Sequence, residues 1–138
     1  MNWFLWALLS AFFAGLTAVL AKIGVENINS NLATAIRTLV IAGFAVPVAF
    51  FTNTQPLWTI GRKTWLFLVL SGIATGLSWL CYFRALQLGE ASRVAPVDKL
   101  SVVVAIALAA IFLGEHLTWR QCIGGLFIFA GAAVLTHA

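Results

Sequence analysis

The sequence predicts an all-α polytopic membrane protein with five transmembrane helices. Of its 138 residues, 62% are hydrophobic and 9% are charged, whereas soluble domains are roughly a quarter charged. Five apolar runs, each near the ~20 residues that cross the hydrocarbon core, are separated by short polar connections. An open strand in lipid would leave its backbone groups unpaired, so the runs are expected to be helices.

We expect the five helices over residues 3–21, 32–51, 65–86, 94–113 and 119–136, in a single domain that covers residues 1–138. The first run could be mistaken for a secretory signal. No Lys or Arg precedes it, however, and it is longer than a usual signal core, so we interpret it as a retained helix. Tryptophans near the ends of the runs favour the membrane interface; they are Trp3, Trp58, Trp65 and Trp119.

Charge and motif content exclude several classes of protein. The net charge is +4, but the eight basic residues form no stripe, which argues against nucleic-acid binding and fits an anionic membrane surface. Cys81 and Cys122 lie inside apolar runs and have no metal-ligand spacing. No Ser–His–Asp set, HExxH motif or phosphate-binding loop occurs. We therefore expect no catalytic residues, no metal, no cofactor and no enzyme activity.

The connections give no clear orientation. On the side of the N-terminus the connections carry Arg62, Lys63 and Arg120, and on the other side they carry Lys22 and Arg93. Orientation follows a clear Lys/Arg excess on one side. Three against two is no such excess, so the sequence permits insertion both ways round.

A cluster of charges is expected on the membrane side opposite the N-terminus. It consists of Lys22, Arg37, Arg84, Asp98 and Lys99. One interpretation is a transport vestibule, in which Asp98, Lys99 and Lys22 are the coupling or gating candidates. The alternative is structural: Arg and Lys extend to the headgroups, and Asp98 pairs with Arg84 or Arg93 and holds two helices together.

The third run carries a polar and aromatic face. Thr75, Ser78, Trp79 and Tyr82 follow i, i+3, i+4, i+7 spacing and therefore share one side of a helix. Thr34, Arg37 and Thr38 of the second run could face the same space. The candidate cavity-lining residues are Arg37, Thr75, Ser78, Trp79, Tyr82 and Arg84. The alternative is that the rings pack between helices and the hydroxyls bond backbone carbonyls.

Three segments carry a family resemblance. They are the "ASRVAP" entry to a helix at residues 91–96, the "FLGEHLT" exit at residues 112–118, and the Gly-rich helix around residues 124–131. Lys22 and Arg37 occupy matching places in the first half. In this order and spacing the chain resembles an EamA domain of the drug/metabolite transporter superfamily, in its half-size, five-helix branch.

The resemblance implies a secondary transporter of small metabolites or drugs, with a central cavity between two inverted repeats. The chain holds one repeat, so we expect a second copy to supply the other in an antiparallel homodimer with dual topology. A separate five-helix partner and a parallel dimer remain alternatives. Other functional hypotheses are an accessory membrane subunit and a flippase subunit for a lipid-linked polar molecule. The expected location is a bacterial inner membrane, with the bilayer and a small-molecule substrate as partners.

Overall fold

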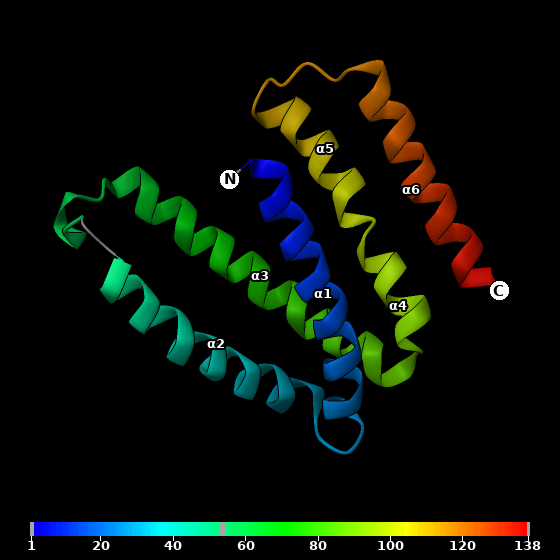
Figure 1. The fold of residues 1–138 in the computed structure, drawn as a ribbon, viewed down its shortest axis with the longest axis horizontal. Helices are drawn as coiled ribbons and strands as arrows, with labels where there is room; N and C mark the ends of the chain where they lie inside the picture. The colour runs from blue at the N-terminus through cyan, green and yellow to red at the C-terminus, as the bar shows by residue number, and fades with distance from the viewer. Residues whose placement is uncertain (1, 53–54, 138) are drawn as a thin grey trace. The chain divides into compact units, whose positions relative to one another are not determined.

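The computed structural model describes residues 2–52 and 55–137. Figure 1 shows the helices in chain order. The described elements are α1 (Trp3–Val25), α2 (Ser30–Thr52), the short 3₁₀ turn η1 (Leu57–Thr59), α3 (Arg62–Leu88), α4 (Ala91–Asp98), α5 (Ser101–Phe112) and α6 (Trp119–His137).

Five helical segments within the described ranges are long and apolar enough to cross a membrane. They are Trp3–Val25, Ser30–Thr52, Arg62–Leu88, Ala91–Phe112 and Trp119–Thr136. Large apolar side chains point away from the protein along these segments; Phe44 is 70% exposed and Phe127 is 74% exposed. Lipid tails solvate such a surface as well as a protein core would. The predicted fold class, an all-α membrane protein of five spanning helices, is confirmed.

The fourth span differs from the continuous helix expected over residues 94–113. It begins at Ala91 and is divided into α4 and α5 at Lys99 and Leu100. There the backbone bonds shorten to three-residue spacing: Lys99 N–H donates to Pro96 O at 3.1 Å and Leu100 N–H donates to Val97 O at 3.0 Å. Such 3₁₀ turns inside a helix often mark a functional hinge.

The chain forms two compact units, which we describe separately. One comprises Ile23–Gln87, with the end of α1, α2, η1 and most of α3; the other comprises Met1–Lys22 and Leu88–Ala138. In the second of these, α6 packs against both α4 and α5. Lys22 Nζ donates to Gly89 O at 3.0 Å, which joins the end of α1 to the α3–α4 connection in that same unit.

Two helix starts are fixed by side-chain caps. Asn29 Oδ1 accepts from Asn31 N–H at 2.8 Å at the start of α2. At α6, Thr118 Oγ1 accepts from Gln121 N–H at 3.4 Å, while Gln121 Oε1 accepts from Thr118 N–H at 2.8 Å. This reciprocal pair is a capping box, which satisfies backbone donors that an isolated helix end leaves unpaired.

The end of α5 depends on a glycine. Gly114 has a φ of 66°, which lies in the left-handed region, and beyond it Glu115 N–H donates back to Ala109 O at 3.4 Å. A side chain at such a position costs about 1 kcal/mol, because the β-carbon approaches the backbone. The Gly of the "FLGE" exit is therefore required by backbone conformation.

We expect Gly114→Ala to lower the free energy of unfolding by about 1 kcal/mol. No atom lies within 4 Å of the β-carbon that the alanine would add, so the cost arises from φ alone. Thermal unfolding of the detergent-purified protein measures the effect. The matched control is Gly43→Ala in α2, which also meets no neighbouring atom and should be neutral or stabilising. Equal midpoints for wild type and Gly114→Ala would contradict the assignment.

Candidate functional site

Arg37 lies against aromatic rings of α3 in the unit formed by Ile23–Gln87. Its Cζ atom is 4.4 Å from the Trp79 ring centroid and 5.4 Å from the Phe83 ring centroid. Both distances are inside the ~6 Å range of cation–π attraction. Phe83 is buried at 4% exposure, and Tyr82 packs edge-on against it at 6.4 Å. A guanidinium on an aromatic platform is therefore the centre of this site.

The threonine hydroxyls near this platform bond their own helices. Thr34 Oγ1 donates to Ser30 O at 2.9 Å, and Thr38 Oγ1 donates to Thr34 O at 2.8 Å. On α3, Thr75 Oγ1 donates to Ser71 O at 2.9 Å. Because each hydroxyl proton is used within a helix, these threonines contribute acceptor oxygens and methyl groups to their surroundings.

Gln87 joins the end of α3 to the α1–α2 connection. Its Nε2 donates to Val25 O at 3.2 Å and to Ile28 O at 2.6 Å, and its Oε1 accepts from Arg84 Nη1 at 3.0 Å. The apolar neighbours are well packed, since Val25 and Leu86 are both fully buried. This junction fixes one end of α2 relative to α3, and it thereby positions Arg37 over Trp79.

Gln87→Ala is expected to lower the free energy of unfolding by ~0.5–1.5 kcal/mol, because two partly solvent-accessible carbonyls at the junction lose their donor. The midpoint of thermal unfolding in detergent reports the loss. Gln55→Ala is a suitable control, because Gln55 Nε2 donates to the exposed Thr59 hydroxyl in a connection and surface changes are usually within ~0.5 kcal/mol. A Gln87 variant as stable as the Gln55 variant would show that the junction contributes nothing.

The other unit places an ion pair at the break in the fourth span. Lys99 Nζ lies 3.3 Å from Asp98 Oδ2. The helical rise puts Asp98 roughly 10 Å inward from Ala91, which is one turn deeper than a helix beginning at residue 94 would give. Across the break, Val102 N–H donates to Lys99 O and Val103 N–H donates to Leu100 O, both at 3.0 Å, which is again a three-residue spacing.

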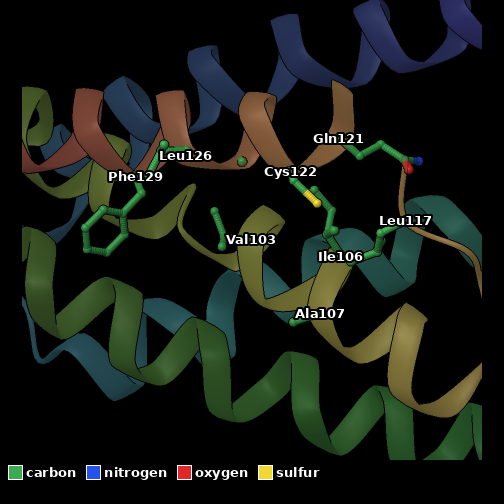
Figure 2. A pocket seen from close by; sticks show the side chains of 9 residues that line it. Val103, Ile106, Ala107, Leu117, Gln121, Cys122, Leu126 and Phe129 are labelled. Atoms are coloured by element: carbon green, nitrogen blue, oxygen red, sulfur yellow. The ribbon is translucent and has the colours of Figure 1, made fainter. Parts of the chain in front are cut away.

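An apolar groove lies between α5 and α6 (Figure 2), with a volume of about 320 Å³. Its lining is Val103, Ile106, Ala107, Leu117, Gln121, Cys122, Gly125, Leu126 and Phe129. Gln121 supplies the main polar group of this lining, and its amide oxygen is already used in the cap of α6. The groove therefore offers little to hold a charged metabolite.

The structure brings some of the candidate residues together. Arg37 and Trp79 are in contact, and Tyr82 adjoins Phe83. Phe83 also lies under Arg37, although it was not among the predicted lining residues because it has no polar group. An aromatic residue one helical turn after Trp79 was the available signal for Phe83. Ser78 and Thr75 lie exposed on α3. Asp98 pairs with Lys99, whereas Arg84 bonds Gln87 and Arg93 pairs with Glu90 at 3.5 Å.

The sequence profile of the EamA-like transporter family matches residues 1–137. The chain is 56% identical over 97% of its length to an uncharacterized transporter in the cobO 3′ region of a Sinorhizobium species, and the match covers 96% of that relative. It is 29% identical over 94% of its length to the uncharacterized transporter YxxF of Bacillus subtilis, of which it covers 41%.

A third similarity is partial. Over 56% of the chain, the identity to a probable amino-acid metabolite efflux pump of Salmonella typhimurium is 43%, and the match covers 26% of that protein. No solved structure matches the chain. The chain thus corresponds to nearly all of one relative and to less than half of two longer ones.

Proposed function

The chain belongs to the EamA-like transporter family, and we propose that it carries small metabolites across the membrane as an antiparallel homodimer. It is a multi-pass membrane protein, and its family and the names of its relatives support a membrane transporter of small metabolites. The observation that supports the proposal most is the match to an uncharacterized transporter over 97% of this chain and 96% of that relative. The longer relatives, of which it covers 41% and 26%, support the need for a second copy.

In this proposal the translocation pathway is lined by the second and third spans and gated at the fourth. Arg37, Thr75, Ser78, Trp79, Tyr82 and Arg84 are the proposed lining residues. Lys22, Asp98 and Lys99 are the proposed gating or coupling residues, and the break between α4 and α5 is the element that moves. Inverted-repeat transporters hold their substrate between two halves that rock against each other, and a second copy inserted upside down provides the missing half.

The proposed location is a bacterial inner membrane, and the first substrates to test are amino acids and their metabolites. The efflux pump of Salmonella typhimurium supports that choice by its name. Purified protein in liposomes decides the matter: substrate flux without any other protein supports transport. Stable co-purification with an unlike subunit, together with no flux, would favour the accessory role instead. Movement of a lipid-linked polar molecule between leaflets would favour the flippase role.

A further inference from the structure

Arg37 differs from the other basic residues near its end of the spans. Each of the others has a polar partner: Lys22 with Gly89 O, Arg84 with Gln87, Arg93 with Glu90, and Lys99 with Asp98. Within residues 2–52 and 55–137, no hydrogen bond or ion pair to Arg37 accompanies its two ring contacts. A guanidinium has five N–H donors in its plane. The rings cover its face and leave the donor edge for a ligand.

Its depth argues against simple contact with headgroups. The helical rise places Arg37 roughly 10 Å inward from Ser30, the first residue of α2. Trp79 lies roughly 13 Å inward from Leu88, the last residue of α3. An arginine that extends to the interface would point toward the nearer helix end. The guanidinium of Arg37 instead lies nearest the ring of Trp79, a residue whose α-carbon is at least as deep as that of Arg37.

No carboxylate on the same two helices can neutralise this charge. Neither α2 nor α3 contains Asp or Glu, and Glu26 in the α1–α2 connection is the one acidic residue of Ile23–Gln87. A cation within a span is costly unless it is paired. The arrangement therefore calls for an anion from outside this pair of helices.

We propose that Arg37, held on Trp79 and Phe83, binds the carboxylate of the transported substrate. The inference rests on the proposed function, and it names the substrate class as small monocarboxylates with an apolar body. A carboxylate matches the guanidinium fork with two parallel hydrogen bonds. The neighbouring threonine protons are used within α2 and α3, so the surroundings suit an aliphatic or aromatic body better than a sugar. A purely cationic substrate is repelled.

Three ligands of similar shape test the charge requirement: phenylacetate, phenylacetamide and phenethylammonium. Binding to the detergent-purified full chain is measured by isothermal titration. We expect phenylacetate to bind, and phenylacetamide and phenethylammonium to bind at least roughly tenfold more weakly, since a hydrogen bond to a charged group is lost. Equal affinities for the acid and its amide would overturn the proposal, as would failure of phenylacetate, butyrate and L-phenylalanine alike to bind.

Variants assign the site. Arg37→Gln should weaken phenylacetate binding by roughly 10- to 100-fold, and Arg37→Lys should recover part of it. Arg62→Gln, in the exposed first turn of α3, is the matched control and should bind as wild type. The thermal unfolding midpoint shows whether each variant is folded. A folded Arg37→Gln protein with wild-type affinity would overturn the assignment.

A lipid phosphate could present the same oxyanion chemistry to Arg37. Short-chain phosphatidylglycerol and the zwitterionic phosphatidylcholine are therefore titrated in parallel. Competition of phenylacetate with phosphatidylglycerol only at wild-type Arg37 supports one shared oxyanion site. Lipid binding that depends on Arg37, with phenylacetate binding that does not, would overturn the substrate assignment. Binding that depends on Arg37, without any flux in liposomes, would contradict the proposed transport function but not this inference. Flux of monocarboxylates that is unaffected by Arg37→Gln would contradict this inference but not the transport function.

Discussion

Liposomes that carry Asp98→Asn are expected to show substrate flux reduced by roughly tenfold or more. The substitution removes the partner of Lys99, whose ammonium lies 3.3 Å from the Asp98 carboxylate at the break in the fourth span. An unpaired charge inside a span costs ~2.5–3.5 kcal/mol, and that cost falls on the element that we propose to move. Initial rates of uptake at equal amounts of reconstituted protein measure the effect.

A second substitution separates stability from function. Asp98→Asn with Lys99→Gln leaves no charge at the break, so we expect the thermal unfolding midpoint to return toward wild type while the flux stays low. Glu90→Gln is the control, because the Arg93–Glu90 pair is exposed at 53% and 74% and such pairs contribute at most ~1 kcal/mol. Wild-type flux in the charge-free double variant would assign the pair a structural role only.

The second large effect concerns orientation. A reporter cysteine at Lys63, the second residue of α3, should be labelled by a membrane-impermeant reagent in about half of the molecules of intact cells, because the Lys/Arg count favours neither orientation. Cys81 and Cys122 are free and exposed, so both must be replaced beforehand. Asn27→Cys, in the connection at the opposite side of the membrane, is the complementary reporter, and its labelled fraction should equal the protected fraction at Lys63.

Labelling of one reporter in all molecules and of the other in none would contradict dual topology, provided that the protein is active as a single species. A shifted balance offers a further check. Adding lysines to the α2–α3 connection should drive all molecules into one orientation and abolish flux. Co-expression with a copy biased the other way should restore flux, because only then are both halves of the antiparallel pair present.

The spans could be predicted from the sequence because hydropathy and length are local properties, but two features at their ends could not. The sequence predicts that the fourth span begins at residue 94, where Pro96 falls in the first turn and is tolerated. The helix begins at Ala91, so Pro96 lies inside α4 and the break follows it. The capping box of Thr118 and Gln121 corresponds to a T-x-x-Q pattern in the sequence. The prediction used Gln121 only as part of the polar start of the last run and assigned it no capping role.

The site was partly accessible to sequence reasoning. Helical spacing placed Trp79 and Tyr82 on one face, and it indicated that Arg37 could meet them. Spacing within one helix cannot say which ring lies under a cation on another helix, since that depends on the junction at Gln87. The contact between Arg37 and the Phe83 ring depends on this arrangement of the two helices, so spacing along the sequence did not predict it. Sequence reasoning offered Arg84 or Arg93 as the partner of Asp98, whereas Asp98 pairs with the adjacent Lys99 and Arg84 bonds Gln87, three residues away.

The adjacency of Asp98 and Lys99 has an electrical consequence. Moving one elementary charge through the membrane potential involves ~2.3 kcal/mol per 100 mV. The pair carries opposite charges on consecutive residues, so its net charge is zero and its displacement performs almost no electrical work. In an antiparallel pair the field acts in opposite senses on the two copies, and a lone charge at the break would make one copy's motion easier and the other's harder. In the antiparallel homodimer that we propose, the neutral pair would allow the broken span of each copy to bend at the same energy whatever the voltage.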